Sequence, residues 1–541
     1  MTSLSLESSV LRGEAFGEAL ARVCADPPSP QPLDGSRYRN VLIPHMVGGE
    51  LEFALFGFLG KALELRGAHV VGLLCDAVLS ACVCRKVDHH ESACTRWCHR
   101  HSGSYASAMG LTHRWYGEFI STDEVERCHA LACSVGVEHI AAFEHDKMPV
   151  GSLVAQSVES YFRVGCFDPD DAHMRRVAWD FLASGLCLLM IAGRVIDQYR
   201  IDKIVSDCGM QVEWGVFRLV AARRGIPVDV INVGLRGSSV KLELDRPGRC
   251  VQRVAGWDRW RSMPLSRAQD EALDAYLARR ELTPYEFKGE RWRNRVADPD
   301  AVRRTIQLPE QVGGRVVSMF PNVGFDAGKT KSRPAFDYAG DWVIETIRWF
   351  AGRGRHHLVV KVHPGEQHRE ARDPMAALIE RRVGVLPGNV HLIGPDCGVT
   401  AQSVVRLSDV CLVYTSTVAV EAVGLNKPVV LAGGGRHAGH GVTIDVHDPA
   451  AYFDRLERIT DGGERPEPPG MLGRRYAYAV FFRADIPIRH FRMLDIHVAE
   501  VLIDTLADLL PGRDPCMDAL CRGVLLDEPF ENPLQPERTS E

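Results

Sequence analysis

Three short segments in the second half of the sequence carry side chains suited to binding phosphate. The first is Lys361-Val-His-Pro-Gly-Glu, where Pro364 ends an apolar run and leaves Lys361 and His363 as hydrogen-bond donors. Ligands of open α/β sheets bind outside the carboxyl ends of the strands, so donors at a strand end predict an anion site. A Lys and a His at this place also serve simply to solvate a sheet edge, and the segment alone leaves both interpretations open.

The second and third segments add hydroxyls and a flexible backbone. Thr415-Ser416-Thr417 follows an apolar run and opens a helix, whose N-terminal N–H groups attract anions. Glu421 lies one turn further, where a carboxylate suits a pair of ribose hydroxyls. The run from Gly433 to Gly441 lets the backbone approach a ligand. Because Ser and Thr are ordinary helix caps and loops are often glycine-rich, neither segment decides the matter alone.

The elements that position these segments alternate between strand and helix in two series. The first series has strands expected at 41–43, 70–74, 203–206 and 228–233, with helices at 50–66 and 214–224. The second has strands at 316–320, 358–362, 390–393, 410–414 and 429–431, with helices at 341–350 and 417–423. Such alternation predicts an α/β fold with two doubly wound, Rossmann-like domains.

A chain of 541 residues is too long for one hydrophobic core, since cores stop growing at roughly 250–300 residues. We therefore expect two main domains. The predicted segments are a loop-like extension at 1–36, an N-terminal domain at 37–256, a helical connection at 257–312, a C-terminal domain at 313–510 that ends in a helical stretch at 491–510, and a mobile tail at 511–541.

Composition excludes some classes of partner. A net charge of -6 gives no basic face, so we expect no binding to nucleic acid. The most apolar stretch, 181–193, is shorter than the roughly 20 residues of a transmembrane helix, and the N-terminus lacks the features of a secretory signal. These observations predict a cytoplasmic protein without a transmembrane segment, for which peripheral association with a membrane stays open.

Taken together, the segments between Phe320 and Arg483 resemble the capsule-polysaccharide-biosynthesis family of GT-B glycosyltransferases. The matching stretches are Pro321-Asn-Val-Gly-Phe-Asp-Ala, Asp341-Trp, Lys361-Val-His-Pro-Gly-Glu, Asn389-Val-His-Leu-Ile-Gly-Pro, Ser408-Asp-Val, Tyr414-Thr-Ser-Thr-Val-Ala-Val-Glu, Lys427-Pro-Val-Val, Gly441-Val-Thr-Ile-Asp and Arg475-Tyr-Ala-Tyr-Ala-Val-Phe-Phe-Arg. The resemblance covers about a third of the chain. It implies a GT-B architecture, in which two Rossmann-like domains face a cleft, and transfer of a sugar from a nucleotide donor without a metal or other cofactor.

The resemblance also implies a donor site. The pairs His363-Pro364 and Ser416-Thr417 are similar to those that hold the donor phosphate in transferases of CMP-linked sialic acid or Kdo, so a CMP-sugar is one expected donor. The acceptor is expected to be a glycan, a lipid-linked molecule or a small molecule. The family often has a bulky, acidic or aromatic stretch where this chain has Gly433–Arg436, a departure that bears on donor specificity. The predicted donor-binding residues are Lys361, His363, Pro364, Glu366, Thr415, Ser416, Thr417, Glu421, Gly434, Gly435, Arg436 and Asp445.

An inverting mechanism also needs a general base to deprotonate the acceptor hydroxyl. His45, Glu50, Asp207 and Glu213 each stand at or just after a predicted strand end in the first half of the chain. Among them we favour Asp207 and Glu50, which follow apolar strands and lie close to glycine. A surface carboxylate or a helix-start charge is the alternative for each.

Five cysteines lie between positions 75 and 98, with histidines among them. Thiolates and imidazoles at short spacing hold zinc, although C-x-C followed by C-x3-C is not a usual zinc arrangement. A structural zinc on Cys82, Cys94 and Cys98 is one hypothesis, and a set of free thiols, some buried as small apolar side chains, is the other.

Three further functions remain open at this point. A sugar-nucleotide 2-epimerase of the GT-B fold would use the same crevice with a UDP-sugar and no acceptor. A polyol-phosphate transferase would move a phosphoryl-linked group. A scaffold without catalysis would bind a nucleotide sugar and release it unchanged.

Overall fold

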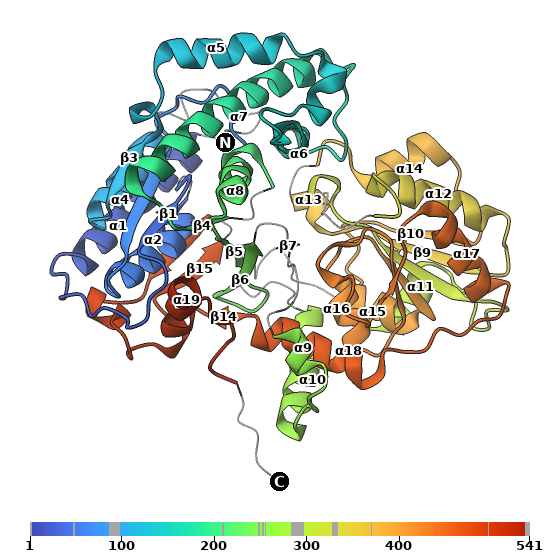
Figure 1. Ribbon diagram of the computed structural model, residues 1–541. Helices are drawn as coiled ribbons and strands as arrows, with labels where there is room; N and C mark the ends of the chain where they lie inside the picture. Colours follow the sequence, from blue (N-terminus) through green and yellow to red (C-terminus); the bar gives the residue numbers. More distant parts are fainter. Residues whose placement is uncertain are drawn as a thin grey trace. The chain divides into compact units, whose positions relative to one another are not determined.

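The structure is a computed structural model that describes residues 3–46, 49–85, 98–207, 210–246, 249–250, 254, 256–282, 297–326, 334–368, 371–495 and 497–535 (Figure 1). The chain divides into two compact units. Unit 1 comprises Met1–Phe162, Phe167–Val251 and Ala484–Gln535, and unit 2 comprises Arg163–Cys166, Gln252–Arg483 and Pro536–Glu541.

Unit 1 is built on an eight-stranded sheet of order β14-β6-β5-β4-β1-β2-β3, with β7 paired to β6. The strands β1 to β5 are parallel, and β6, β7 and β14 pair antiparallel. The side chains of β1 and β2 are mostly buried and apolar, and β4 is buried along its whole length, as expected for parallel strands covered on both faces. The strands are β1 (Asn40–Ile43), β2 (His69–Leu74), β3 (His113–Trp115), β4 (Lys203–Ser206), β5 (Val228–Val233), β6 (Ser239–Arg246), β7 (Arg249–Cys250) and β14 (Ile486–Pro487).

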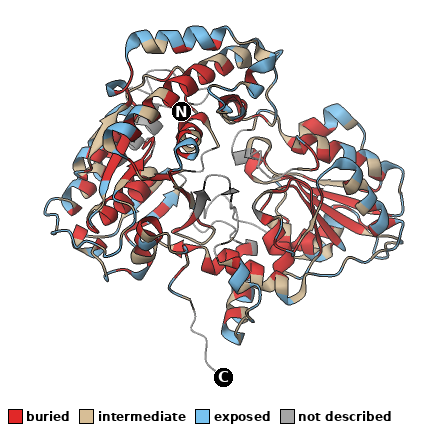
Figure 2. Cartoon of the chain, viewed as in Figure 1, coloured by how far each residue is buried: buried red, intermediate tan, exposed pale blue. Residues whose placement is uncertain are grey.

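Helices surround this sheet, and the longest of them, α7, contains a long apolar window. Among the described residues, α7 alone is long and apolar enough to cross a membrane, yet 72% of its apolar window is buried within the protein. It packs against α5, α6 and α8, and Figure 2 shows its inner face in red. We therefore interpret α7 as a core helix. The helices of unit 1 are α1 (Ser3–Val23), α2 (Glu50–Glu64), α4 (Arg100–Ala108), α5 (Thr122–Cys133), α6 (Val150–Phe162), α7 (Ala172–Tyr199), α8 (Val212–Arg224) and α19 (Pro515–Leu526).

Unit 2 holds a six-stranded, fully parallel sheet of order β10-β9-β8-β11-β12-β13. Counted along the chain this is 3-2-1-4-5-6, the order of a dinucleotide-binding Rossmann fold. Trp342 and Tyr452, from helices on one face, are fully buried against the central strands. The strands are β8 (Val316–Phe320), β9 (His357–Lys361), β10 (Val390–Ile393), β11 (Val410–Val413), β12 (Val429–Leu431) and β13 (Ile444–Asp445).

The helices of unit 2 include those expected to connect the two domains. α9 and α10 fall in the stretch 257–312, and α10 packs against α18 within unit 2. Two α/β units with mainly parallel sheets confirm the predicted fold class. The helices are α9 (Trp257–Trp260), α10 (Arg267–Leu282), α11 (Pro299–Thr305), α12 (Ala339–Ala351), α13 (Gly365–His368), α14 (Met375–Val383), α15 (Ala401–Leu407), α16 (Val418–Gly424), α17 (Pro449–Thr460) and α18 (Gly470–Tyr478).

The terminal segments differ from the sequence prediction. Residues 1–36 contain the helix α1 instead of being loop-like throughout. The stretch 491–510 forms the hairpin β15 (Phe491–Asp495) and β16 (Val498–Val501) instead of a helix, because buried and exposed side chains alternate along β15. The supposed mobile tail contains α19, which Asp514 caps and which buries an apolar face in unit 1. Ala484–Gln535 therefore belongs to unit 1, not to the C-terminal domain.

Candidate functional site

The carboxyl edge of the unit 2 sheet brings the three predicted segments together. Strand order reverses between β8 and β11, which are adjacent although β9 and β10 separate them in sequence. A crevice forms outside the carboxyl ends of strands at such a point, and ligands of doubly wound sheets bind there. The loops that follow β8, β9, β11 and β12 all leave the sheet at this edge.

Hydrogen bonds link the loops after β8, β11 and β12 to one another, and separately link the ends of β9 and β10. The Asn322 side-chain oxygen, after β8, accepts a hydrogen bond from the Thr415 N–H, after β11, at 3.2 Å. The Gly433 N–H donates to the Tyr414 carbonyl at 3.0 Å, which joins the loops after β12 and β11. The Lys361 ammonium donates to the Gly394 carbonyl at 3.0 Å and so joins the ends of β9 and β10.

His363 has one ring nitrogen fixed by the backbone. Its Nδ1 accepts a hydrogen bond from the Gly365 N–H at 2.9 Å. An N–H group only donates, so Nδ1 must present its lone pair, and the neutral ring carries its hydrogen on Nε2. His363 is half-buried. This orientation gives the imidazole a second nitrogen that donates, as a phosphate oxygen requires.

The start of α16 is arranged by Ser416. Its hydroxyl accepts a hydrogen bond from the Val418 N–H at 3.3 Å, and the side chain is buried. Thr417, which precedes the helix, has helical dihedral angles and makes no capping bond with its side chain. The Ser416 hydroxyl therefore has a local structural role, and α16, at seven residues, contributes only a short helix dipole.

The glycine-rich loop after β12 needs its glycines for conformation. Gly434 and Gly435 have φ of 71° and 82°, in the left-handed region that side chains with a Cβ disfavour. Asp445 closes the loop, because its carboxylate accepts hydrogen bonds from the Gly439 N–H at 2.7 Å and the Thr443 hydroxyl at 2.6 Å. Asp445 thus shapes the loop. The side chain of Arg436 lies outside the described residues.

Two predicted donor-binding carboxylates are built into the interior of unit 2. The Glu421 oxygens accept hydrogen bonds from Arg280 at 2.8 Å and Gln402 at 3.2 Å, which accounts for its burial without a ligand. Glu366 is 5% exposed and accepts a hydrogen bond from the Met375 N–H at 3.0 Å. Burial raises its pKa to about 7, although the bond from Met375 opposes the rise. Both carboxylates therefore accept hydrogen bonds from neighbouring residues in the interior of unit 2.

The four candidate general bases lie in unit 1, where Glu213 is fully buried and accepts a hydrogen bond from the Val83 N–H. Glu50, in the first turn of α2, is 7% exposed and accepts a hydrogen bond from the Ala499 N–H at 3.2 Å. Asp207 follows the carboxyl end of β4 and is half-buried. Because β4 and β1 adjoin where the strand order of unit 1 reverses, Asp207 keeps the position expected of a residue at a ligand crevice.

His45 does not suit the role of general base. It is 3% exposed, its Nδ1 lies 2.8 Å from the Tyr116 hydroxyl, and its Nε2 lies 3.8 Å from the Cys82 sulfur. Burial lowers its pKa to about 3, so the ring takes up a proton poorly near neutral pH. This corrects the sequence prediction, which included His45 among the candidate general bases together with Asp207 and Glu50.

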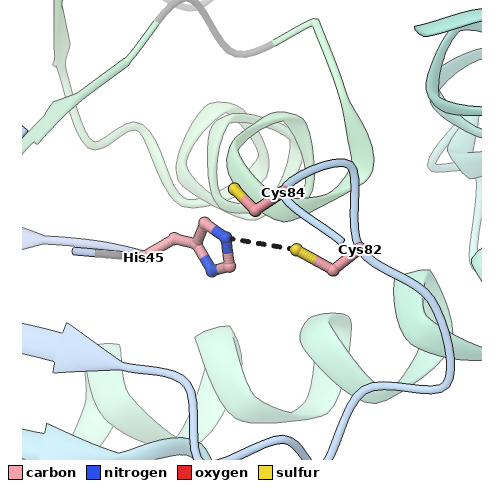
Figure 3. Close-up of side chains that lie close together, drawn as sticks. All are labelled: His45, Cys82 and Cys84. Atoms are coloured by element: carbon pink, nitrogen blue, oxygen red, sulfur yellow. Dashed lines mark hydrogen bonds between the residues drawn. The ribbon is translucent and has the colours of Figure 1, made fainter. Parts of the chain in front are cut away.

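The cysteine hypothesis also changes. The potential ligand atoms of His45, Cys82 and Cys84 lie within 4.8 Å of one another (Figure 3). Cys94 lies outside the described residues, and Cys98 does not belong to this group. Of the three predicted ligands, only Cys82 belongs to the group that the structure brings together. The sequence prediction did not include Cys84 or His45 as ligands. The C-x-C spacing was the available signal for Cys84, and no sequence signal linked it to His45.

Comparisons with known proteins concern the fold. No protein-family model matches the chain, and no curated protein matches it. Similar solved structures include KpsC of Thermosulfurimonas dismutans, a beta Kdo 2,7 transferase, with 12% identity over 55% of this chain and 82% of that chain and a TM-score of 0.32. The UDP-GlcNAc 2-epimerase from Neisseria meningitidis, bound to UDP-GlcNAc, has 11% identity, coverage of 81% and 96%, and a TM-score of 0.23. The calicheamicin glycosyltransferase CalG4 has 15% identity, coverage of 82% and 94%, and a TM-score of 0.26.

Proposed function

We propose that this protein is a glycosyltransferase that binds a nucleotide-sugar donor at the carboxyl edge of the unit 2 sheet. The observation that carries the proposal is the meeting of the loops after β8 and β11, where Asn322 bonds to Thr415 at the reversal of strand order. His363 lies on the next loop, after β9, with its Nε2 as a donor. A nucleotide phosphate needs donors of this kind at such an edge.

The chemistry of transfer suits these groups. Departure of the nucleotide leaves negative charge on its phosphate, and fixed donors that face this charge lower the barrier. In the proposal His363 donates from Nε2, Lys361 supplies positive charge, and the backbone at Gly434 and Gly435 approaches the donor closely. The proposed reaction uses no metal at this site.

The donor and acceptor classes follow from the sequence resemblance. A CMP-sugar is the proposed donor, because the His363-Pro364 and Ser416-Thr417 pairs are similar to those of transferases that use CMP-linked sugars. The proposed acceptor is a glycan of the capsular type, met in the cytoplasm or at the inner face of a membrane. Asp207 is the proposed general base, because it is half-buried and follows the carboxyl end of β4, where the strand order of unit 1 reverses.

Thermal-shift measurements with CMP, UDP, GDP and their sugar conjugates test the donor site. A ligand that binds only the folded state raises the melting temperature by mass action, so one nucleotide family should do so. His363→Ala should remove the shift. His357→Ala is the matched control, because His357 begins the same strand β9 at the opposite edge and its loss should leave the shift intact. A retained shift in His363→Ala would place the phosphate elsewhere.

The products separate this proposal from the other functions. Incubation with the stabilising nucleotide sugar and a set of glycan acceptors should release free nucleotide only when an acceptor is present. Conversion of a UDP-sugar to its epimer without an acceptor would indicate the epimerase, and a phosphoryl-linked product the polyol-phosphate transferase. Asp207→Asn should abolish transfer and keep the nucleotide-induced shift in melting temperature. If the wild-type protein binds the nucleotide sugar without turnover, the proposed transferase activity is contradicted.

A further inference from the structure

The group formed by His45, Cys82 and Cys84 has the composition of a site for a soft divalent cation. The three residues come from the loop after β1 and the loop after β2, and their potential ligand atoms lie within 4.8 Å of one another (Figure 3). In a tetrahedral zinc site, bonds of about 2.0–2.3 Å place neighbouring ligand atoms roughly 3.3–3.8 Å apart. The separation of 3.8 Å between the Cys82 sulfur and His45 Nε2 fits one edge of such a site.

The imidazole is oriented as a metal ligand requires. His45 Nδ1 lies 2.8 Å from the hydroxyl of Tyr116, a fully buried side chain, and Nε2 faces the Cys82 sulfur. When Nδ1 donates its hydrogen to the tyrosine oxygen, Nε2 presents its lone pair toward the thiols. Metal-binding histidines are commonly held in this way by a second group behind the ring.

Two backbone hydrogen bonds to two different helices fix the loop that carries the two cysteines. The Ala81 N–H, just before Cys82, donates to the Ser184 hydroxyl at 2.9 Å. The Val83 N–H, between the cysteines, donates to the Glu213 carboxylate at 2.7 Å. Both partners stand on helices of unit 1, α7 and α8. The cysteines are therefore held at a short separation before any ion binds, which lowers the conformational entropy lost on binding.

We propose that His45, Cys82 and Cys84 bind one zinc ion through Nε2 and two thiolate sulfurs. Binding releases the two thiol protons to solvent, because zinc takes the thiolate form. The ion ties the loops after β1 and β2 together beside α8 and so stabilises unit 1. This role is structural and independent of the nucleotide site in unit 2.

Glu213 lies next to the loop of the two cysteines but does not belong to the group of ligand atoms that lie within 4.8 Å of one another. It is fully buried in the first turn of α8, and its Oε1 already receives the Val83 N–H. Its other oxygen, Oε2, is buried and has no hydrogen-bond partner among the described residues. The Glu213 carboxyl therefore holds the loop through the Val83 N–H and is not counted among the zinc ligands.

Metal analysis of the full-length protein, purified without added metal or chelator, is the direct test. We expect close to one zinc per chain, removal by a strong chelator with a fall in melting temperature, and recovery of both on adding zinc chloride. Cobalt(II) added to the chelated protein should give a thiolate-to-cobalt charge-transfer absorption. The inference is overturned if the wild-type protein holds no zinc and takes up none, whatever the outcome of the nucleotide tests.

Variants locate the ligands. Cys84→Ser should lose the bound zinc and the cobalt charge-transfer band of two thiolates. Cys133→Ser is the matched control, because Cys133 also lies near a histidine, 3.7 Å from His129, in a pair that no third ligand joins within the described part of the chain. Tyr116→Phe keeps the ring and removes the group behind His45, and it should weaken zinc binding by roughly 10–100-fold.

Discussion

The side-chain oxygen of Asn322 accepts a hydrogen bond from the backbone N–H of Thr415 at 3.2 Å, across the junction of β8 and β11. The two residues are 93 positions apart in sequence and leave adjacent strands at the same edge of the sheet. The bond fixes the loop after β8 against the turn that leads into α16. It thereby sets the shape of the crevice in which we place the donor nucleotide.

Replacing Asn322 should therefore affect both stability and binding. Asn322→Ala removes one hydrogen bond and should lower the free energy of unfolding by about 1 kcal/mol, together with the nucleotide-induced shift in melting temperature. Asn322→Asp keeps an acceptor for the Thr415 N–H but adds negative charge beside the proposed phosphate. It should be nearly as stable as the wild type and bind nucleotide less well. Unchanged nucleotide binding in Asn322→Asp would argue against a phosphate at this junction.

Glu366 should make stability depend on pH. Burial raises its pKa from 4.5 to about 7, so between these values the folded state binds more protons than the unfolded state. Stability should then fall as the pH rises from 4.5 to 7. Glu366→Gln keeps an oxygen for the Met375 N–H and cannot ionise. Above pH 7 it should be more stable than the wild type by about 3 kcal/mol, and below pH 4.5 equally stable.

Urea unfolding across this pH range measures the effect. Glu380→Gln is the control, because Glu380 is an exposed glutamate on α14, the helix that begins at Met375. Its replacement should leave the pH profile unchanged. A Glu366→Gln profile parallel to that of the wild type would show that the carboxyl does not titrate as its burial requires.

Arg280 and Glu421 form a buried ion pair, so removing one of the two charges should destabilise unit 2 more than removing both. The two side chains are 3% and 8% exposed and lie 2.8 Å apart. Arg280→Met leaves the Glu421 charge buried beside the Gln402 amide without its cation, and should cost about 3–5 kcal/mol. The double variant Arg280→Met/Glu421→Leu removes both charges and should recover much of this loss, which denaturant unfolding of the two variants measures. Equal losses in both variants would contradict the argument.

The central α/β pattern could be predicted because it depends on local signals. Apolar runs such as 316–320 and 410–414 are short and bounded by glycine, proline or polar residues, and they became β8 and β11 within one residue. The return of Ala484–Gln535 to unit 1 could not be predicted in the same way. β14 pairs with β6 by placing Ile486 opposite Val240, and no local periodicity encodes a pairing between such distant parts of the chain.

The same distinction between local signals and distant pairings applies to the candidate site. Strand-end residues such as His363 were predictable, since a strand end can be found from the sequence. The partners of Glu421 were not, because Arg280 comes from α10, 141 residues away. The grouping of His45 with Cys84 depends likewise on the pairing of β1 with β2, which brings their following loops together. Side-chain chemistry was visible in the sequence, whereas the pairing of distant side chains required the fold.

The helix α19 provides the last prediction, because the sequence alone favoured a mobile tail there. Lys203 is fully buried in β4, and its ammonium lies 3.0 Å from Asp229 and 3.2 Å from Asp527, which follows α19. Arg66, 2% exposed, forms an ion pair with Asp518 of α19 at 2.5 Å. Truncation after Leu510 would take Asp527 from a buried ammonium and expose the face of α2 that α19 covers.

Truncation after Leu510 should therefore prevent stable folding of unit 1, and a point variant should show the reason. Leu525 is fully buried in α19, so Leu525→Ala should lower the free energy of unfolding by about 2–5 kcal/mol. Arg522, on the same helix, forms an exposed ion pair with Glu528, and Arg522→Ala should cost less than about 1 kcal/mol. Denaturant unfolding compares the two variants. If both were as stable as the wild type, the packing of α19 would contribute nothing, and the truncated chain should then fold; if Leu525→Ala alone is destabilised, the segment after Pro511 is part of the core of unit 1.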